Sequence, residues 1–354
     1  VWAPTRESIV RLAGSADAPV RDVTLRGLDL SATTTPLTAG GFAARFFAGA
    51  VEGVHTEGCV LADLHIHAVG GQGIRMDRLA GLRIEGCTVA ESGAGGIYCT
   101  AGADAVLCNN RVHHVGRAYP SAVGIRTSGQ RFDVRHNEVH DTPYSGIIAS
   151  GRDGRFHANR IWNVMGELED GAAIYVTFCR RMTLCGNHVS GILTRRGHAY
   201  YLDEQAVHCL VEGNVADNVA WPSHNHMAHD NRIANNLFRT DGDLKLTFPR
   251  CRDFVVKGNV LQAGGAITVE RPAGAFDRFA GNLIHSATGV CQDAITEDYA
   301  IRSTGELTDH AENTFADPGL QRTDGCALAC APDGPAAMLG LEIPDVADAG
   351  CRAE

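Results

Sequence analysis

The feature that most constrains the fold is an asparagine that recurs through the middle of the chain in one small context. Each copy lies one or two positions before an aliphatic residue, as in Asn137-Glu138-Val139, and Cys87 takes the equivalent place one step before the first copy. The copies are Asn110, Asn137, Asn159, Asn187, Asn214, Asn236, Asn259 and Asn282. From Cys87 onward the gaps are 23, 27, 22, 28, 27, 22, 23 and 23 residues.

A repeat of roughly 20–50 residues is typical of stacked arrays, and short β-rich units of this length form the rungs of a parallel β-helix. We therefore expect an all-β, single-stranded, right-handed parallel β-helix over residues 1–302, with the handedness of parallel crossover connections. The asparagines should stack as a ladder at one corner, each amide bonding to the copies above and below.

The repeat stops near residue 303, and prolines punctuate the segment 303–354. Because an array must cover its exposed apolar surface to stay soluble, we expect this irregular segment to cap the helix or pack along its side. Its apolar residues that should be buried in this way are Leu320, Leu328, Met338 and Leu339.

Composition agrees with such a fold and excludes some partners. Glycine is abundant, with 41 copies, and aromatic residues make up only 6%, as expected where tight turns join short strands. A formal net charge of -10 argues against a nucleic-acid partner, and no apolar run reaches the length of about 18 residues that spans a membrane. The oligomeric state is left open.

The twelve cysteines show no CxxC spacing, so a zinc ribbon or a thioredoxin-like site has no support. They are typical of small buried hydrophobic residues, and their scatter favours a reducing compartment. Because the chain begins at Val1 rather than at Met, we expect the natural N-terminus to lie outside it, so no signal sequence is visible.

The unequal gaps indicate where a binding face lies. The rungs after Asn110, Asn159 and Asn187 hold about five extra residues, inserted in the loop before the next strand. Insertions that repeat on one side of a solenoid usually build its binding face.

Aligning the strands that follow this loop gives two outward columns, because strand residues alternate faces with period two. If the first aliphatic residue points inward, the first column reads Tyr98, Arg126, Ile148, Tyr175, Tyr201 and His224. The second reads Ser128, Ser150, Thr177, Asp203 and His226. Asp203 and His226 should then be near neighbours on an exposed, sugar-binding surface, since a buried unpaired carboxylate is unfavourable.

Several of these segments resemble right-handed parallel β-helix enzymes around glycoside hydrolase family 141, a pectate-lyase-like fold. The resemblance runs along the whole chain. It is carried by Val1-Trp2-Ala3-Pro4, Val69–Ile74, Gly93–Gly96, Gly116–Pro120, Pro143–Ile147, Asp170–Tyr175, Tyr201–Glu204, His224-Asn225-His226, Phe315–Pro318 and Asp333–Ala336. Members usually have a longer N-terminal portion, and the family also allows a secreted location.

The resemblance implies that Asp170 and Asp203 form the catalytic carboxylate pair of a glycoside hydrolase acting on a polysaccharide or oligosaccharide. These matching segments and the outward columns together predict that Tyr175, Tyr201, Glu204, His224 and His226 bind the substrate, and the first column adds Arg126. Neighbouring rungs separate side chains by about 5 Å, closer to the carboxylate spacing of retaining than of inverting enzymes. Asp170 precedes Gly171 and is also compatible with a plain turn. Glu204 is either the true catalytic acid or a solvated charge at a strand end.

The chain departs from the family at Ala172 and Ala173, where relatives tend to have glycine, and at Gln205, Met227 and Ala228. Side chains added at close-approach positions reshape or close a subsite, so the substrate or the activity itself is in question.

No cofactor and no metal are expected. His224 and His226 lack the three or four converging ligands of a zinc site, and His65, His67, His113 and His114 are interpreted as ordinary strand and turn residues. Two other functions stay open. One is a lyase, epimerase or isomerase acting on a uronate or a small biosynthetic substrate, although only two lysines, Lys245 and Lys257, could serve as a base. The other is a carbohydrate-binding β-helix without catalysis.

Overall fold

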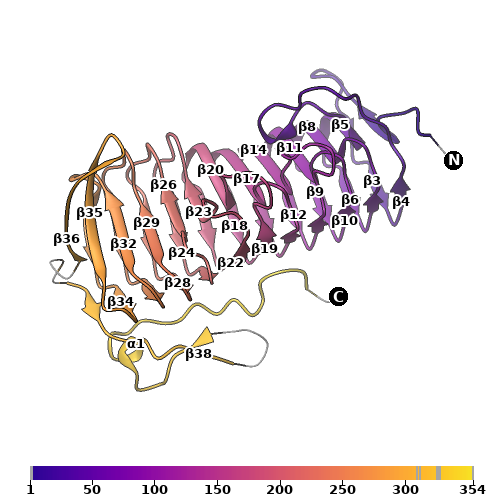
Figure 1. Ribbon diagram of the computed structural model, residues 1–354. Coiled ribbons are helices and arrows are strands. Elements are labelled where there is room, and N and C mark those ends of the chain that lie inside the picture. The colour runs from indigo at the N-terminus through magenta and orange to yellow at the C-terminus, as the bar shows by residue number, and fades with distance from the viewer. Residues whose placement is uncertain (1–2, 308–309, 311, 324–327, 353–354) are drawn as a thin grey trace. The chain divides into compact units, whose positions relative to one another are not determined.

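The computed structural model describes residues 3–307, 310, 312–323 and 328–352. They form two compact units, which are described separately. Unit 1 comprises Val1–Tyr175, Ile192–Gly197 and Gly350–Glu354, and unit 2 comprises Val176–Gly191 and His198–Ala349. In both, parallel strands stack into three sheets of a right-handed parallel β-helix, so the predicted fold class is confirmed (Figure 1).

Unit 1 contributes a run of six successive strands to each sheet, with one further strand, β2, at the side of sheet 1, and neighbouring strands are hydrogen-bonded in the order given. Sheet 1 has β1 (Val10–Ala13), β5 (Gly49–Glu57), β8 (Gln72–Ala80), β11 (Ile97–Ala103), β14 (Ile125–Gln130) and β17 (Ile147–Arg152), with β2 (Val20–Arg21) also paired to β5. Sheet 2 has β3 (Thr24–Arg26), β6 (Val60–Ala62), β9 (Arg83–Glu85), β12 (Val106–Cys108), β15 (Asp133–Arg135) and β18 (Arg155–His157). Sheet 3 has β4 (Asp29–Ser31), β7 (His65–His67), β10 (Thr88–Ala90), β13 (Arg111–His113), β16 (Glu138–His140) and β19 (Arg160–Val164). A short 3-10 helix, η1 (Phe42–Ala44), lies between β4 and β5, and β20 (Ala172–Arg180) crosses the boundary between the units.

Unit 2 repeats this arrangement. Its sheet 1 has β23 (His198–Leu202), β26 (Ser223–Asn225), β29 (Leu244–Thr247), β32 (Ile267–Arg271), β35 (Cys291–Glu297) and an antiparallel last strand, β36 (Ala300–Glu306). Sheet 2 has β21 (Thr183–Cys185), β24 (Leu210–Glu212), β27 (Arg232–Ala234), β30 (Phe254–Lys257) and β33 (Phe276–Ala280). Sheet 3 has β22 (His188–Ile192), β25 (Val215–Asp217), β28 (Leu237–Thr240), β31 (Val260–Ala263), β34 (Leu283–Ser286) and β37 (Thr314–Phe315). A hairpin of β38 (Gln321–Arg322) and β39 (Leu328–Ala329) and the helix α1 (Pro335–Met338) follow.

The core follows from the short strands of sheets 2 and 3. A typical strand there is three residues long, so only its middle side chain points inward, as with Leu107 in β12 and Val112 in β13. In sheet 1 the first aliphatic residue points inward, as predicted: Ile97, Ile125 and Ile147 are aligned and fully buried.

The asparagine ladder is confirmed within each unit. In unit 1 the amide of Asn110 donates to Asn137 Oδ1 at 2.9 Å, and that of Asn137 donates to Asn159 Oδ1 at 2.9 Å. In unit 2 the same bond links Asn187 to Asn214, and the series continues through Asn236, Asn259 and Asn282 to Asn313, a copy that the sequence pattern missed.

A turn conformation explains the small or polar residue that precedes each ladder position. That residue has a positive φ before every ladder position from Cys87 to Asn282, from 52° at Ala158 to 66° at Gly258. Glycine and asparagine tolerate this left-handed conformation best, which is why they dominate here.

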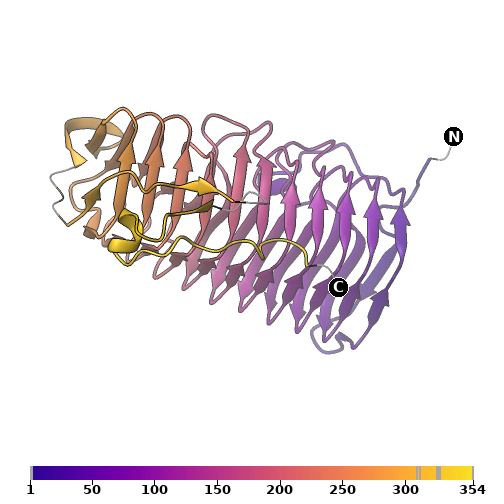
Figure 2. The same cartoon turned by 90° about the horizontal axis from the view of Figure 1, so that it is seen from below.

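The C-terminal segment lies along sheet 3 of unit 2 (Figure 2). Leu320 and Leu328 pack against a row of buried residues at the starts of successive strands, which are Val215, Leu237, Val260 and Leu283. The expectation of burial is wrong for Met338 and Leu339, which are 76% and 44% exposed, because Ala336 is the buried residue of α1. The division of the chain at residue 302 stays a prediction.

Candidate active site

Asp203 and His226 form the centre of the candidate site in unit 2. His226 Nδ1 lies 2.9 Å from Asp203 Oδ1, and its Nε2 lies 2.7 Å from the hydroxyl of Tyr299. These distances fit a chain in which Tyr299 donates to the imidazole and the imidazole donates to the carboxylate. The predicted proximity of Asp203 and His226 is thereby confirmed.

The backbone fixes both residues just beyond the ends of paired strands. In β23 and β26, Tyr201 is aligned with His224 and Leu202 with Asn225, so the following residues emerge side by side. The amide of His226 donates to Leu202 O at 2.9 Å, and the amide of Asp203 donates to Val176 O at 2.8 Å. Two rigid strand ends therefore hold the carboxylate and the imidazole at one place.

One expectation about Asp203 is wrong. The residue was expected on an exposed surface, but only 6% of it is accessible. The objection to burying a carboxylate applies to an unpaired one, and His226 supplies the partner.

Rings and charges continue the site along the outer face of sheet 1. The column that holds Tyr201 and His224 continues through Thr247 to Glu270. The Tyr201 and His224 ring centroids are 4.4 Å apart, and His224 Nδ1 is hydrogen-bonded to the hydroxyl of Thr247. Tyr201 faces outward as predicted but is 3% exposed, since neighbouring rings cover it.

Beside this column lies a basic residue in an aromatic setting. Lys245 Nζ lies 4.5 Å from the centre of the Trp221 ring and 2.5 Å from Glu270 Oε1. The Trp221 ring stacks on His198 at 5.3 Å, and His198 stacks on His224 at 4.4 Å. The site thus combines flat ring surfaces with an anion and a cation.

Unit 1 carries three of the predicted site residues. Asp170 is exposed, with φ at 58°, and its backbone carbonyl accepts a hydrogen bond from the Tyr144 hydroxyl at 2.7 Å, so it also serves as a turn residue. Tyr175 is only 8% exposed, and the Phe42 ring packs edge-on against it at 6.3 Å. The expectation of an open face is therefore wrong at Tyr175, because the loop that contains η1 covers it.

Arg126 lies on the same outward face, aligned with Tyr98 and Ile148 as predicted. It is half-buried, and no residue that the structure describes forms an ion pair or hydrogen bond with its guanidinium group. Burial lowers the pKa of Arg126 from its ordinary value. A half-buried cation without a protein partner is suited to an anionic group of a ligand.

Glu204 is partly buried, and its backbone carbonyl accepts a hydrogen bond from the Phe178 amide at 2.7 Å. Asp170, Tyr175 and Arg126 belong to unit 1, whereas Asp203, Tyr201, Glu204, His224 and His226 belong to unit 2. The pairing of Asp170 with Asp203 therefore stays a prediction.

The sequence pattern missed several members of the site. Thr247 and Glu270 could have been found by continuing the first outward column for two further rungs. Tyr299 could not, because it lies in the turn between the antiparallel strands β35 and β36, outside the repeat. All eleven cysteines that the structure describes are free, and most are buried, in line with a packing role.

Within the described residues, no helix is long and apolar enough to cross a membrane. No curated protein matches the chain. Among solved structures, one described as "Glycoside hydrolase" aligns with a TM-score of 0.57 and 18% identity, covering 66% of this chain and 51% of that one. Another, "The complex structure of XylC with xylose", has a TM-score of 0.55 and 12% identity, covering 90% and 56%. A third, "a new PL6 alginate lyase complex with trisaccharide", has a TM-score of 0.51 and 9% identity, covering 98% and 95%.

At these identities the similarities show a shared fold, and the chain spans about half the length of the first two structures. The family model "Right handed beta helix region" matches residues 49–238, which is more than half of the 354 residues. Together with the rungs and ladders described above, this match assigns the chain to the right-handed β-helix family.

Proposed function

We propose that this protein is a carbohydrate-active enzyme of the glycoside hydrolase type, with Asp203 and Asp170 as its catalytic carboxylates. The observation that carries the proposal is the Asp203 carboxylate, which is nearly buried and is held by His226 on the outer face of sheet 1. Burying a carboxylate is costly unless a partner holds it, so a nearly buried carboxylate paired with a histidine is a candidate functional group.

The surroundings of Asp203 suit a sugar. Glycoside hydrolysis needs one acid to protonate the leaving oxygen and one carboxylate to attack the sugar or to activate water. Trp221, which is partly exposed, supplies aromatic surface near the carboxylate column, and Tyr299, 57% exposed, supplies a hydroxyl. The resemblance to glycoside hydrolase family 141 implies Asp203 and His226 as members of the same site.

Glu270 is an unsuitable partner for Asp203 within unit 2. It stands three strand spacings from Tyr201 along the column, which is roughly 14 Å at about 4.8 Å per strand. That exceeds the carboxylate separation of retaining and of inverting enzymes. We therefore propose Asp170 as the second catalytic carboxylate.

The test compares turnover of the full chain on a panel of aryl glycosides and oligosaccharides, including xylose-containing ones. Asp203→Asn should lower kcat by about 10²–10⁴-fold, the usual contribution of a general acid or base. Asp230→Asn is the matched control, because Asp230 also pairs with a histidine, His229, at 2.6 Å but lies at an exposed turn. Equal activity of Asp203→Asn and the control would refute the role of Asp203.

The role of Asp170 is tested separately. Asp170→Asn should lower kcat to a similar extent. In the wild-type reaction, NMR should show that the first product retains the anomeric configuration of the substrate. A normal rate with Asp170→Asn would leave Asp203 without its proposed partner. Binding of the sugars without any turnover would favour a carbohydrate-binding β-helix.

A lyase acting on a uronate is the second candidate. One observation favours it: Lys245 lies on the outer face of sheet 1 beside Trp221. A lysine can remove the proton next to a uronate carboxylate. Unsaturated products detected by ultraviolet absorbance, and lost in Lys245→Ala, would establish the lyase in place of the hydrolase.

A further inference from the structure

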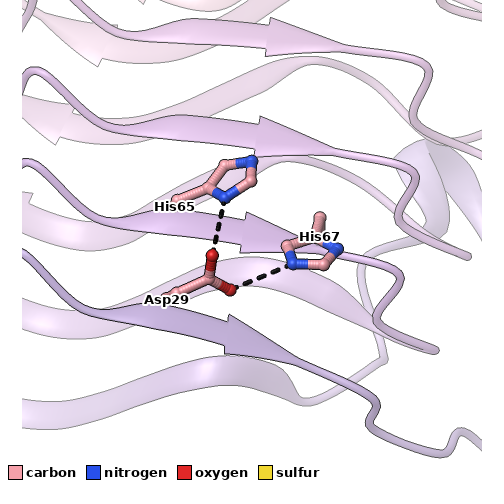
Figure 3. Close-up of side chains that lie close together, drawn as sticks. All are labelled: Asp29, His65 and His67. Carbon is pink, nitrogen blue, oxygen red and sulfur yellow. Dashed lines mark hydrogen bonds and ion pairs between the residues drawn. The ribbon is translucent and has the colours of Figure 1, made fainter.

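We propose that Asp29, His65 and His67 form a binding site for one divalent transition-metal ion of the zinc type. The three side chains converge on the outer surface of unit 1 (Figure 3). His65 Nδ1 lies 3.0 Å from Asp29 Oδ2, and His67 Nε2 lies 3.0 Å from Asp29 Oδ1. This site is independent of the candidate active site, and its test does not depend on any activity.

The strands of sheet 3 bring the three residues together. His65 and His67 are two positions apart in β7, so both side chains leave the same face. Asp29 lies in the neighbouring strand β4, directly aligned with His65, while Ser31 is aligned with His67. The carboxylate therefore faces both imidazoles across one strand spacing.

The spacing of the ligand atoms fits a metal shell. One ligand atom from each residue can be chosen so that all three lie within 4.8 Å of one another. Bonds of about 2.0–2.1 Å to zinc in a tetrahedral arrangement place ligand atoms about 3.4 Å apart, and each imidazole nitrogen lies 3.0 Å from one of the two Asp29 oxygens. A small outward shift of the imidazoles would complete the geometry.

The donor set indicates the kind of ion. Two imidazoles with one carboxylate suit zinc, copper, nickel or iron, whereas calcium and magnesium prefer oxygen ligands. All three side chains are at least partly exposed, so water can enter and complete the coordination. Without an ion, the two hydrogen bonds to Asp29 hold the ligands near their binding positions.

The position in the fold suggests a stabilising role. β4 is the edge strand at the N-terminal end of sheet 3, and among the described strands its neighbour is β7. An ion held by Asp29 on β4 and by two histidines on β7 would clip this terminal strand to its neighbour, where arrays are prone to fray.

A second cluster in unit 1, formed by His114, His140 and Asp141, is less suitable. His140 is stacked between His113 at 4.8 Å and Trp162 at 4.1 Å, which fixes its ring. His114 Nδ1 lies 3.9 Å from Asp141 but only 2.8 Å from His113 Nδ1.

The experiment is calorimetric titration of Zn²⁺ and, separately, of Mg²⁺ into the chelator-treated full chain at neutral pH. Replacing both His65 and His67 by alanine should remove one equivalent of bound Zn²⁺. Each single alanine variant should weaken that site at least tenfold, since even outer-shell partners of metal ligands are worth roughly 10–100-fold. His285→Ala is the matched control, because His285 also lies on sheet 3 and faces a single carboxylate, that of Asp317, at 3.9 Å.

A second readout reports on the strand itself. Zn²⁺ should slow hydrogen exchange of the β4 amides in the wild-type chain and leave it unchanged in the double variant. Because these side chains are at least partly exposed, the variants should keep the circular dichroism spectrum of the wild type. The same number of Zn²⁺ equivalents in the wild type and the double variant, or equal binding of Mg²⁺ and Zn²⁺, would overturn the proposal.

Discussion

Removing one link of the asparagine ladder should destabilise the protein far more than removing its exposed neighbour. The side chain of Asn236 takes part in four hydrogen bonds. Its amide donates to Val211 O and Asn259 Oδ1, both at 2.9 Å, and its Oδ1 accepts from Asn214 N at 3.0 Å and Asn214 Nδ2 at 2.9 Å. Asn236→Ala therefore removes the acceptor of the buried backbone amide of Asn214, whereas the Asn214 side-chain amide keeps its bonds to Leu184 O and Glu212 O.

The magnitude follows from these contacts. One orphaned buried group costs roughly 1–3 kcal/mol, and the two lost bonds donated by the Asn236 amide add about 0.5–1.5 kcal/mol each, so we expect a loss of about 2–6 kcal/mol in the free energy of unfolding. Asn235→Gly is the control: Asn235 has φ at 54°, which glycine also adopts, and the change removes only an exposed bond to Glu212. Urea unfolding of both variants, followed by circular dichroism, measures the difference. A cost for Asn236→Ala within about 0.5 kcal/mol of that for Asn235→Gly would refute the ladder as a source of stability, since that is the usual range of surface substitutions.

Three further predictions concern single residues. Ala158→Gly should raise the unfolding free energy by up to about 1 kcal/mol, because Ala158 has a left-handed φ of 52° and the backbone strain that glycine removes exceeds the entropy that glycine costs. Urea unfolding measures the change, and a loss of stability would contradict this reasoning. Burial raises the pKa of the Cys87 thiol to about 12, so iodoacetamide at neutral pH should alkylate Cys87 only after the protein has been unfolded. Mass spectrometry measures the labelling, and rapid labelling of the native protein would contradict the burial of Cys87. Arg271→Ala should lower the unfolding free energy by up to roughly 3–5 kcal/mol, because it removes the guanidinium that contacts the buried Asp293 carboxylate at 2.5 Å and leaves His310, at 3.1 Å, as its partner. Arg271→Met combined with Asp293→Leu should cost less, and an equal or larger cost of the double variant would disprove the pairing argument.

Much of the candidate site could be predicted from the sequence because strands impose a fixed alternation. The columns that place Tyr98 beside Arg126 and Tyr201 beside His224 follow from period two and the repeat spacing. The same rule placed Asp203 close to His226.

Burial at the site could not be predicted in the same way. Whether an outward residue meets solvent depends on segments outside the repeat, such as the loop with Phe42 that covers Tyr175 and the turn that brings Tyr299 to His226. Such loops follow no periodic rule, so the local sequence does not indicate where they fold back.

The fold follows from the local sequence, because buried asparagines and left-handed turn residues that recur every 22–28 residues are compatible with few arrangements other than stacked rungs. Which polar residues meet depends on tertiary contacts. Asp29 and His67 are 38 positions apart, and His226 and Tyr299 are 73 apart. Their contacts arise from the register of neighbouring rungs and from the path of a single turn, and these are settled by packing across the whole array rather than by any local pattern.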